Sequence, residues 1–509
     1  MNEANLGTRV PNDHTAAEAA SAHFDVLIIG AGLSGIGAAC HLVRKRPQTT
    51  FAILEARNAI GGTWDLFRYP GIRSDSDMST FGYAFRPWVD SKAIADGSSI
   101  LSYLAETAKA FGVDRHIRCG FKVVRAAWRS KNASWSLGVE GPDGEKLAFS
   151  CGFLIFCTGY YEYEAGYMPG WPGMGRFGGR VVHPQTWPED LNCDGKRVVV
   201  VGSGATAVTL VPAMASRAAH VVMLQRSPTY VVARPSEEAI DNRLRRRLPA
   251  RLALGVIRWK NILLQMYLYR LSRRKPAAMR AQILKLAQAE IGPDLNAAQY
   301  FNPRYNPWDQ RMCIVPDGDL FGAMRAGKAS IVNGEIETFT ETGLRLTSGE
   351  DIAADVIVTA TGLKVRLMGG VAIEVDGAPV NVAALTCYKG AMFSDVPNLA
   401  SIFGYTNASW TLKSDLIADY VCRLLRHMER RRYAICTPRL GDTAISDGPT
   451  LPLTSGYIER ARDVLFKQGT KKPWRLNQNY ALDVMALRLG AIEDGALEFK
   501  QRDPMRDAA

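Results

Sequence analysis

The sequence contains no run of about eighteen apolar residues, which is the length that a membrane-spanning helix requires. Its nine cysteines include no Cys-x-x-Cys pair and no spacing typical of a zinc site or a redox disulfide, which indicates a reducing compartment. Residues 1–22 are polar and alanine-rich, with acidic residues and no apolar core, so they resemble neither a secretion signal nor a transit peptide. We therefore expect a cytoplasmic protein with a disordered lead-in over residues 1–22 and no bound metal.

Acidic residues are scarce in one part of the chain. Between Asp241 and Glu290 thirteen lysines and arginines stand against two acids, and this excess is nearly the whole net charge of +12. Apolar clusters in the same stretch predict a helical subdomain over about 240–300. A basic amphipathic stretch can contact an anionic membrane, here the inner face of the cell membrane, or can be only a solvated helix face or a channel rim. No nucleic-acid-binding motif accompanies the charge, so a nucleic-acid partner is not expected.

The first glycine-rich motif follows an apolar, strand-like run. His23–Gly35 reads HFDVLIIGAGLSG, so Gly30, Gly32 and Gly35 have the G-x-G-x-x-G spacing, and an alanine-rich helix follows. The first glycine allows a tight turn, the second lets the backbone approach a pyrophosphate, and the third lets helix and strand pack closely. The next strand ends at Glu55, whose carboxylate can accept hydrogen bonds from a ribose 2′-hydroxyl. The pattern predicts a dinucleotide site for an unphosphorylated adenosine, such as that of FAD.

A second motif of the same kind lies further along the chain. Residues 202–207 read GSGATA, a G-x-G-x-x-A turn after the apolar strand 197–201. The strand that follows leads to Arg226, close to the place that Glu55 has in the first motif. A cation there suits a 2′-phosphate, so the motif predicts an NADPH site, unless Arg226 is only a solvated surface residue.

Two strand-like segments end in glycine in the same way, Phe153–Gly159 and Asp355–Gly362. We interpret the second as the return of the chain to the first domain. The expected fold class is α/β, with two Rossmann-like dinucleotide-binding domains, the second inserted in the first. Residues 23–160 would form the first part of the FAD-binding domain, 161–354 the NADPH-binding domain with its helical insertion, and 355–509 the second part of the FAD-binding domain with the C-terminal region.

The stretch between the two motifs contains Phe177, Gly179, His183 and Trp187. His183 and Trp187 each precede a proline, which favours an extended strap over a helix. In isolation they could be a surface histidine and a packing residue. Between two cofactor domains we expect them to couple the domains, so that loss of His183 would slow flavin reduction and uncouple turnover.

An irregular loop rich in glycine, proline, tryptophan and charge follows the second strand, over Gly61–Asp65 and Arg68–Asp75. Its glycines and prolines could simply mark turns. Loops at this place in such a fold face the cofactor, however, and Asp75 is a candidate polar group beneath a ring system. Loops near Tyr305, Trp308 and Tyr405 are expected to shape the pocket.

Together these motifs resemble the class B flavin monooxygenases. Phe177, Gly179, His183 and Trp187 are similar to the Baeyer–Villiger fingerprint F-x-G-x-x-x-H-x-x-x-W, and GGTWDLFRYPGIRSDSDM with NPWDQRMCIVPDGDLF most resemble the ethionamide-activating type of mycobacteria. The resemblance covers about residues 24–479 and implies that Asp75 lies beside an active-site arginine, Arg311. The usual Lys-Arg pair of the family is Gln310-Arg311 here, so no lysine contact to NADPH is expected at this position.

The resemblance also implies the chemistry. NADPH would reduce FAD, and O₂ would give a flavin peroxide that inserts one oxygen next to a ketone carbonyl to form an ester or lactone, with thioethers or thioamides as further substrates. Arg311 would stabilise the negative charge that develops in the reaction, and Asp75 would hold Arg311 in place. The implied cofactor contacts are Gly30, Gly32, Ser34, Gly35, Glu55, Thr63, Trp64, Asp65, Leu66, Arg73, Ser74, Asp75, Val123, Gly202, Ser203, Gly204, Ala205, Thr206, Ala207, Val208, Arg226 and Ser227.

Three other functions use related folds. An S- or N-oxygenating flavin monooxygenase without Baeyer–Villiger activity is the nearest. A pyridine-nucleotide disulfide reductase needs a cysteine pair beside the flavin, which the scattered cysteines disfavour. The third alternative is a non-catalytic flavoprotein redox sensor. Such a protein would have no need of Asp75 and Arg311, so their presence disfavours it. The sequence predicts no oligomeric state.

Overall fold

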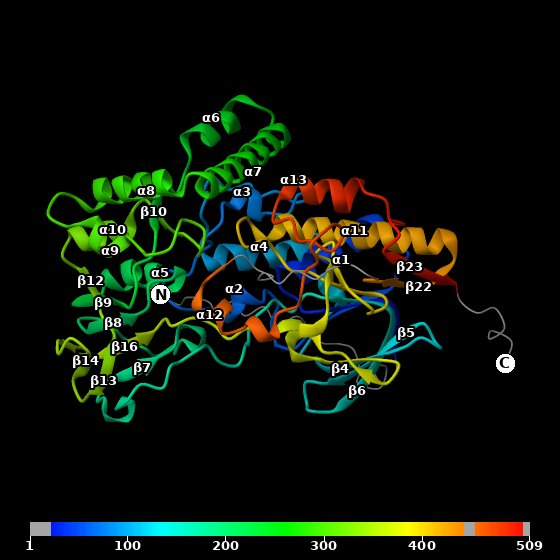
Figure 1. Cartoon of the computed structure of the whole chain (residues 1–509), viewed down its shortest axis with the longest axis horizontal. Helices are drawn as coiled ribbons and strands as arrows, with labels where there is room; N and C mark the ends of the chain where they lie inside the picture. The colour runs from blue at the N-terminus through cyan, green and yellow to red at the C-terminus, as the bar shows by residue number, and fades with distance from the viewer. Residues whose placement is uncertain (1–21, 442–452, 502–509) are drawn as a thin grey trace.

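The chain folds around two sheets that lie side by side (Figure 1). The structure, a computed structural model, describes residues 22–441 and 453–501. The lead-in expected over residues 1–22 lies outside the described residues, apart from Ala22, which begins the first strand.

The first sheet combines strands from both ends of the chain. Its order is β18-β17-β4-β5-β6-β1-β2-β3, with β21 also paired to β6. Val26 and Ile28 pack on one side of this sheet and Leu27 and Ile29 on the other, which explains why the strand reads as an uninterrupted apolar run. The strands are β1 (Ala22–Ile29), β2 (Phe51–Glu55), β3 (Ile117–Cys119), β4 (Lys122–Arg129), β5 (Ser134–Glu140), β6 (Lys146–Phe156), β17 (Ala372–Val375), β18 (Ala378–Pro379) and β21 (Leu399–Ser401).

The second sheet has five parallel strands in the order β12-β9-β8-β16-β7. Val198 and Val200 pack on one side and Val199 and Val201 on the other, so this sheet is also covered on both faces. Its strands are β7 (Arg180–Val182), β8 (Arg197–Val201), β9 (His220–Gln225), β12 (Ala329–Asn333) and β16 (Val356–Thr359).

The position of β16 corrects the expected domain boundary. We expected residues 355–362 to return to the first domain, but β16 pairs in parallel with both β7 and β8 of the second sheet. Its likeness to Phe153–Gly159 has another cause: each segment ends against the first glycine of its own sheet's turn, Gly30 in one case and Gly202 in the other. The chain re-enters the first sheet only at β17, so the inserted domain extends through residue 359.

The chain crosses between the sheets twice, and the two crossings form a two-stranded ribbon. The Glu162 N–H donates to the Lys364 carbonyl over 2.8 Å, and the Tyr167 N–H donates to the Gly362 carbonyl over 3.0 Å. The Glu162 carboxylate also pairs with Arg366 at 2.6 Å. The expected strap is therefore not a free linker: the segment just before it pairs with the returning chain, and its residues 180–182 form β7 of the second sheet.

A helix begins directly at each glycine-rich turn, as expected. They are α1 (Leu33–Lys45) and α5 (Ala205–Ala215). The amphipathic helix α11 (Trp410–Arg431) packs beside α1 in one core. Asp415 of α11 pairs with His41 of α1 at 3.1 Å, so the C-terminal part of the chain completes the first domain.

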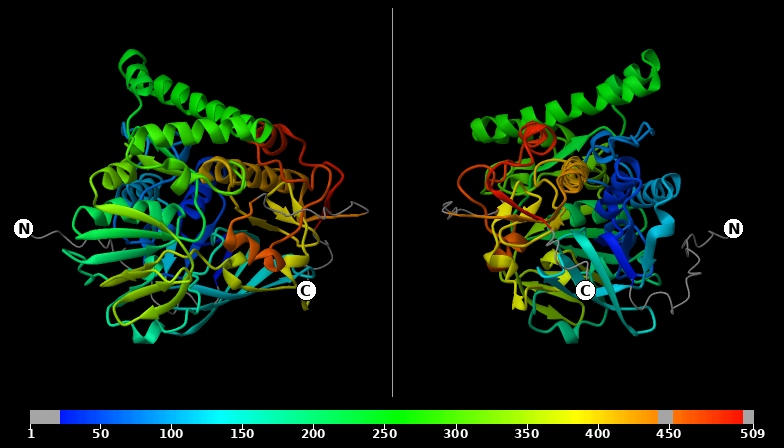
Figure 2. Two further views of the ribbon diagram at one scale, coloured as in Figure 1. Left: turned by 60° about the vertical axis from the view of Figure 1, so that its left-hand side comes forward. Right: turned by 90° about the vertical axis from the view of Figure 1, so that its right-hand side faces the viewer.

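The helical subdomain forms one edge of the molecule (Figures 1 and 2). It consists of α6 (Ala239–Arg247), α7 (Ala250–Arg274), α8 (Pro276–Ile291) and α9 (Ala297–Phe301), close to the range 240–300 that the sequence predicts. Pro276 begins α8, where its missing N–H costs no hydrogen bond. Within residues 22–441 and 453–501, no helix has the length and apolar character needed to cross a bilayer.

Shorter elements complete the two domains. They are α2 (Thr63–Leu66), α3 (Met78–Phe81), α4 (Gly97–Ala110), α10 (Asp319–Arg325), α12 (Gly456–Glu459), α13 (Tyr480–Asp483), β10 (Val231–Arg234), β11 (Cys313–Pro316), β13 (Ile336–Thr340), β14 (Gly343–Leu346), β15 (Asp351–Ala353), β19 (Cys387–Tyr388), β20 (Met392–Phe393), β22 (Tyr433–Pro438) and β23 (Leu497–Gln501).

Candidate functional site

The first glycine-rich turn is tightly packed. Gly30 has φ of 101°, and a Cβ there would lie 2.7 Å from the Cys157 carbonyl oxygen. A Cβ at Gly35 would lie 1.9 Å from the Gly30 carbonyl oxygen, so α1 can approach the turn only with glycine at this position. A Cβ at Gly32 would lie 3.6 Å from the Cα of Gly62, an ordinary contact distance, so the backbone here is open to a ligand.

Glu55 is buried at the end of β2. The Ala31 N–H donates to its Oε2 over 2.7 Å, and the Arg57 N–H donates to its Oε1 over 2.9 Å. Burial raises the pKa of this carboxyl group, and the two backbone donors and the Arg57 charge oppose the rise. Each carboxylate oxygen can accept a further hydrogen bond, as a ribose hydroxyl would require.

A cavity of about 350 Å³ opens beside this turn. Gly30, Gly32, Glu55, Arg57 and Val123 line it. A second cavity, of about 300 Å³, shares Gly32 and Tyr163 with the first and extends to the space between the two sheets. Two adjacent cavities that share the half-buried Gly32 fit an extended dinucleotide, with its pyrophosphate at the turn.

The second cavity contains an ion pair between the two domains. Arg311 Nη1 lies 3.1 Å from Asp75 Oδ2, as the resemblance implies, and the Arg311 side chain remains 38% exposed towards the cavity. The Asp75 carboxylate raises the pKa of Arg311 well above its usual value, against an opposing effect of burial. The guanidinium is therefore a fixed positive charge at this place.

Aromatic side chains wall the same cavity. Tyr160 stacks on Trp410 with ring centroids 5.5 Å apart, and Trp410 Nε1 donates to Ser34 Oγ over 2.8 Å. Trp64 also lines the cavity and packs edge-on against Phe81. Flat apolar walls with a cation at one end fit a flavin ring system.

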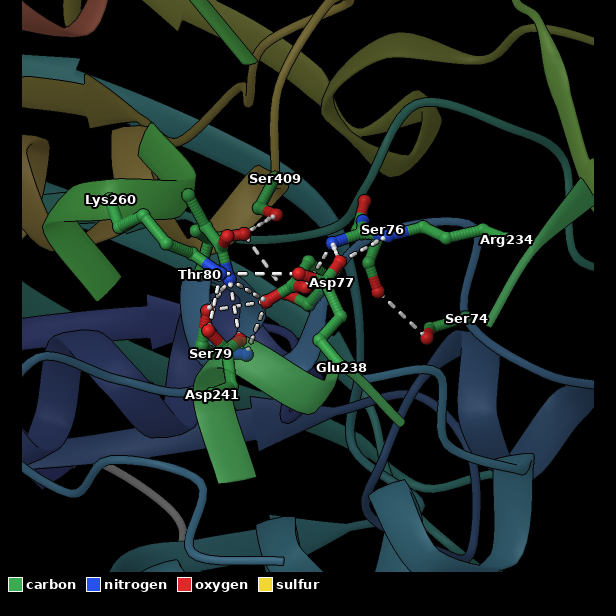
Figure 3. A network of polar contacts seen from close by, with 11 residues as sticks. Ser74, Ser76, Asp77, Ser79, Thr80, Arg234, Glu238, Asp241, Lys260 and Ser409 are labelled. Carbon is green, nitrogen blue, oxygen red and sulfur yellow. Dashed lines mark hydrogen bonds and ion pairs between the residues drawn. The ribbon is translucent and has the colours of Figure 1, made fainter. Parts of the chain in front are cut away.

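A buried polar network holds the loop that carries Asp75 (Figure 3). Ser76 Oγ donates to Asp75 Oδ1 over 3.3 Å, and the adjacent Asp77 caps α3 and pairs with Arg234 at 2.8 Å. Arg234 pairs with Glu238, which in turn pairs with Lys260 of α7 at 3.1 Å. The loop is thus tied to the second domain and to the helical subdomain.

The loop that carries Arg311 contacts the other end of α7. Arg273 pairs with Asp309 at 2.5 Å, and the ring of Tyr269 packs against Trp308 with centroids 5.6 Å apart. α7 therefore contacts both loops that form the Asp75–Arg311 pair.

The second glycine-rich turn is more open than the first. A Cβ at Gly202 would lie 2.4 Å from the Ala360 carbonyl oxygen, but a Cβ at Gly204 would meet nothing within 4 Å. Arg226 and Ser227 are exposed after β9, and Arg226 forms no ion pair with the described residues. Burial lowers the pKa of Arg460, and the charge of Arg226 contributes to the decrease. An exposed arginine without an acidic partner among the described residues would favour an anionic group beside Arg226.

Phe177, Gly179 and Trp187 of the linker pack on the second domain. Phe177 lies against Phe339 in a buried cluster, and a Cβ at Gly179 would lie 2.3 Å from the Asp355 carbonyl oxygen. His183 is buried, its Nδ1 accepts from the Gln185 N–H over 3.1 Å, and burial lowers its pKa. Trp187 packs on the core of the second sheet.

The structure brings most of the sequence-predicted residues to the two cavities. Gly30, Gly32, Glu55 and Val123 line the first, and Gly32, Ser34, Thr63, Trp64, Arg73, Ser74, Asp75, Ala205, Thr206, Val208 and Arg311 line the second. Gly35, Asp65, Leu66, Gly202, Ser203, Gly204, Ala207, Arg226 and Ser227 line neither. Asp65 is buried and pairs with Arg57 at 2.6 Å, so it supports the site from behind.

Sequence reasoning missed the aromatic residues of the site. Three of them, Tyr160, Tyr161 and Tyr163, directly follow the strand that ends at Gly159. The position of that strand end beside the first turn could have predicted that these tyrosines line the site. The expected pocket-shaping residues Tyr305, Trp308 and Tyr405 are not in the lining of the second cavity. Tyr405 instead donates to Asp483 over 2.6 Å in the interior.

Two further features bear on the type of site. All nine cysteines lie in the described ranges, and all are free thiols. The described residues contain no group of three or more His, Cys, Asp or Glu side chains that could hold a metal ion.

Two glycine-rich turns, each after a strand that pairs in parallel with its neighbours, with adjacent cavities and an ion pair between the two domains, define a flavoenzyme that uses two dinucleotides. Residues 24–367 match the family described as flavin-binding monooxygenase-like, and the chain belongs to that family. It is 52% identical over 483 residues to the putative FAD-containing monooxygenase MymA of Mycobacterium tuberculosis, which covers 94% of this chain and 97% of that protein. It is 49% identical over 481 residues to the FAD-containing monooxygenase EthA of the same species, over 94% and 98% of the two chains.

Solved structures share the fold. A steroid monooxygenase bound to NADP superposes with a TM-score of 0.73 at 20% identity, over 94% of this chain and all 100% of that one. A cyclohexanone monooxygenase bound to ε-caprolactone gives a TM-score of 0.70 at 19% identity, with the same coverage. The α/β fold and the predicted family are confirmed, and the chain is a flavin-dependent monooxygenase.

Proposed function

We propose that the protein is an FAD-dependent, NADPH-consuming monooxygenase that carries out Baeyer–Villiger oxidation of ketones to esters or lactones, with sulfoxidation of thioethers or thioamides as a second activity. The observation that carries this proposal is the Asp75–Arg311 ion pair, which faces an aromatic-walled cavity between the two dinucleotide turns. The relatives MymA and EthA are named FAD-containing, and solved structures of this fold include complexes with FAD and NADP.

The chain's own residues have distinct roles in this proposal. The first turn and Glu55 would hold the adenosine end of FAD, and Trp64, Tyr160 and Trp410 would enclose its ring. When bound, reduced FAD supplies the electrons that activate O₂. Arg226 would bind the 2′-phosphate of NADPH, because it is an exposed cation after β9 with no acidic partner among the described residues.

Arg311 would act by electrostatics. Addition of oxygen to a ketone carbonyl develops negative charge, and a guanidinium fixed by Asp75 stabilises that charge without having to move. Ser76 in turn holds Asp75 through its hydroxyl group. The aromatic walls exclude water and so protect the activated oxygen from loss as H₂O₂.

An S- or N-oxygenating enzyme without Baeyer–Villiger activity is the main alternative. Oxygen transfer to a soft sulfur develops less charge on the substrate and has less need of a fixed cation. The ion pair that fixes Arg311 at the cavity therefore favours the ketone reaction over this alternative. A panel of cyclic, linear and aryl ketones with thioethers separates the two by their products.

Replacement of Arg311 tests the role of the ion pair. We expect Arg311→Ala to keep NADPH oxidation but to lower ester or lactone formation about a hundredfold or more, with H₂O₂ as the product instead. Product and H₂O₂ are measured together during NADPH consumption. Gln310→Ala is the matched control, since Gln310 donates to the Thr454 carbonyl over 3.3 Å and points away from the pair. Undiminished ester formation by Arg311→Ala would remove Arg311 from the mechanism.

We also propose that the protein acts in the cytoplasm and contacts the inner face of the cell membrane through the basic segment 241–290. The excess positive charge of this segment supports the proposal.

A further inference from the structure

α7 presents a row of large apolar side chains to solvent. Spacings of three and four residues place them on one face of the helix. The opposite face of α7 is buried against the body of the protein through residues such as Ala253, Ile257 and Ile262. The row consists of Leu252, Val256, Trp259, Leu263 and Tyr267, which are 53%, 39%, 51%, 58% and 61% exposed. We call this row the α7 stripe.

The α7 stripe is unusual for a protein surface in water. Single exposed apolar residues are common, but a continuous row along several turns of one helix marks a binding surface. Leu264 and Leu268 of α7 are exposed beside the stripe, whereas exposed residues such as Val89, Met168 and Leu489 belong to separate segments. Figures 1 and 2 show α7 along the edge of the molecule, beside α6, and Trp259 of the stripe packs edge-on against Tyr480 of α13 with ring centroids 5.9 Å apart.

The charge around the stripe has one sign. α7 contains no aspartate or glutamate. Exposed arginines stand at both ends, Arg247 and Arg251 at the start and Arg270 and Arg274 at the end, and none of them pairs with an acid among the described residues. Other basic residues of the segment are used internally; Lys260, for example, pairs with Glu238. A partner for this face must therefore be apolar in the middle and anionic around it.

We propose that the α7 stripe docks on an anionic phospholipid bilayer, with α7 lying in the plane of the surface. The leucine and valine side chains of the stripe would insert among the acyl chains, and Trp259 and Tyr267 would lie at the level of the headgroups. The arginines would pair with lipid phosphates. This inference rests on the membrane contact proposed above and narrows it from a fifty-residue basic segment to one helix face. A second copy of the chain suits the face less well, because a symmetric pairing would bring arginine ends against arginine ends.

The test is cosedimentation of the FAD-loaded protein with vesicles. We expect binding to phosphatidylcholine vesicles that contain phosphatidylglycerol and much weaker binding to phosphatidylcholine alone, with a decrease as salt rises. Leu252→Ser/Leu263→Ser should weaken binding about tenfold or more, because both side chains would lose apolar burial. Arg251→Gln/Arg270→Gln should weaken it about fivefold for each arginine and only on anionic vesicles. The matched control is Leu489→Ser, since Leu489 is 72% exposed but lies outside α7.

Several results would overturn the proposal. These are failure of the wild-type protein to bind anionic vesicles, equal binding by the stripe variant, and an equal loss in Leu489→Ser. If the stripe variant instead turned a dimer into a monomer and left vesicle binding unchanged, the face would be a contact between copies of the chain. All variants should oxidise a water-soluble ketone at the wild-type rate, which separates a failure of docking from a failure of the proposed reaction.

Discussion

The two glycine-rich turns have the same backbone arrangement but differ in how closely the surrounding atoms pack against them. In both, the first glycine has positive φ and lies against the carbonyl group that follows a neighbouring strand. A Cβ added at Gly30 would lie 2.7 Å from that carbonyl oxygen, and a Cβ added at Gly202 would lie 2.4 Å from the corresponding oxygen. A Cβ added at Gly35, the third glycine of the first turn, would lie 1.9 Å from a backbone oxygen. The counterpart of Gly35 in the second turn is Ala207, so α5 already accommodates a side chain there.

The residues that would meet the ribose differ in the same sense. Glu55 is buried and already accepts two backbone hydrogen bonds, whereas Arg226 is exposed and has no ion-pair partner among the described residues. A walled site with a preformed acceptor suits a nucleotide that stays bound. An open site with free cations suits one that exchanges in each cycle. Under the proposed assignment, the first turn would hold a resident FAD and the second an exchanging NADPH.

The largest effect is expected where the first turn is tightest. Gly35→Ala places a methyl group against the Gly30 carbonyl, and α1 must move away from the turn. We expect nearly complete loss of bound FAD, measured as flavin absorbance per polypeptide after purification. The matched change Ala207→Gly in the second turn should cost only about 1 kcal/mol of helix stability and leave FAD content unchanged. A Gly35→Ala protein with a full complement of FAD would show that the two turns are not different in this way.

An intermediate effect is expected at the open turn. Arg226→Ala removes a cation that can form charge-assisted hydrogen bonds to a 2′-phosphate, so KM for NADPH should rise about tenfold or more while KM for NADH stays nearly constant. Steady-state kinetics with both coenzymes measures the split. Equal changes for the two coenzymes would assign Arg226 a role other than recognition of the 2′-phosphate.

The smallest effect concerns the buried acid. Burial raises the pKa of Glu55 above its ordinary value of 4.5, so the folded protein binds more protons than the unfolded chain at pH values just above 4.5. The contribution of Glu55 to the free energy of unfolding is therefore greatest at low pH and decreases as the pH rises through its folded pKa. In the FAD-free protein, Glu55→Gln should reduce this decrease, measured by urea unfolding at a series of pH values. Arg226→Gln, in the open turn, should leave the pH profile unchanged, and an identical profile in Glu55→Gln would contradict the expected shift.

The sequence predicted what local chemistry determines. Glycine spacing, the apolar strands and the helix that follows each turn depend on neighbours within about thirty residues, and all are present as expected. β16 was assigned to the wrong domain because a strand that ends in glycine reads the same in either sheet, and only its pairing with β8 distinguishes them. The proximity of Asp75 and Arg311 came from the family resemblance, since nothing in their spacing indicates that two distant loops meet.

The aromatic walls and the contacts of α7 depended on tertiary structure. Trp410 reaches the cavity because α11 packs beside α1. α7 contacts the loop that carries Asp75 through Asn261, which donates to Asp77, and the loop that carries Arg311 through Arg273, which pairs with Asp309. Neither arrangement has a periodic or motif signal in the sequence. The exposed stripe of α7 was likewise hidden, because the same apolar residues could have been core.

The insertion of one domain in the other also determines an order in time. All five strands of the second sheet lie within residues 180–359, so this domain can close as soon as that stretch leaves the ribosome. The first sheet begins at residue 22 but still lacks β17, β21 and α11 at that moment. We expect the domain that begins synthesis first to finish folding last, and its flavin to be taken up only near the end of translation.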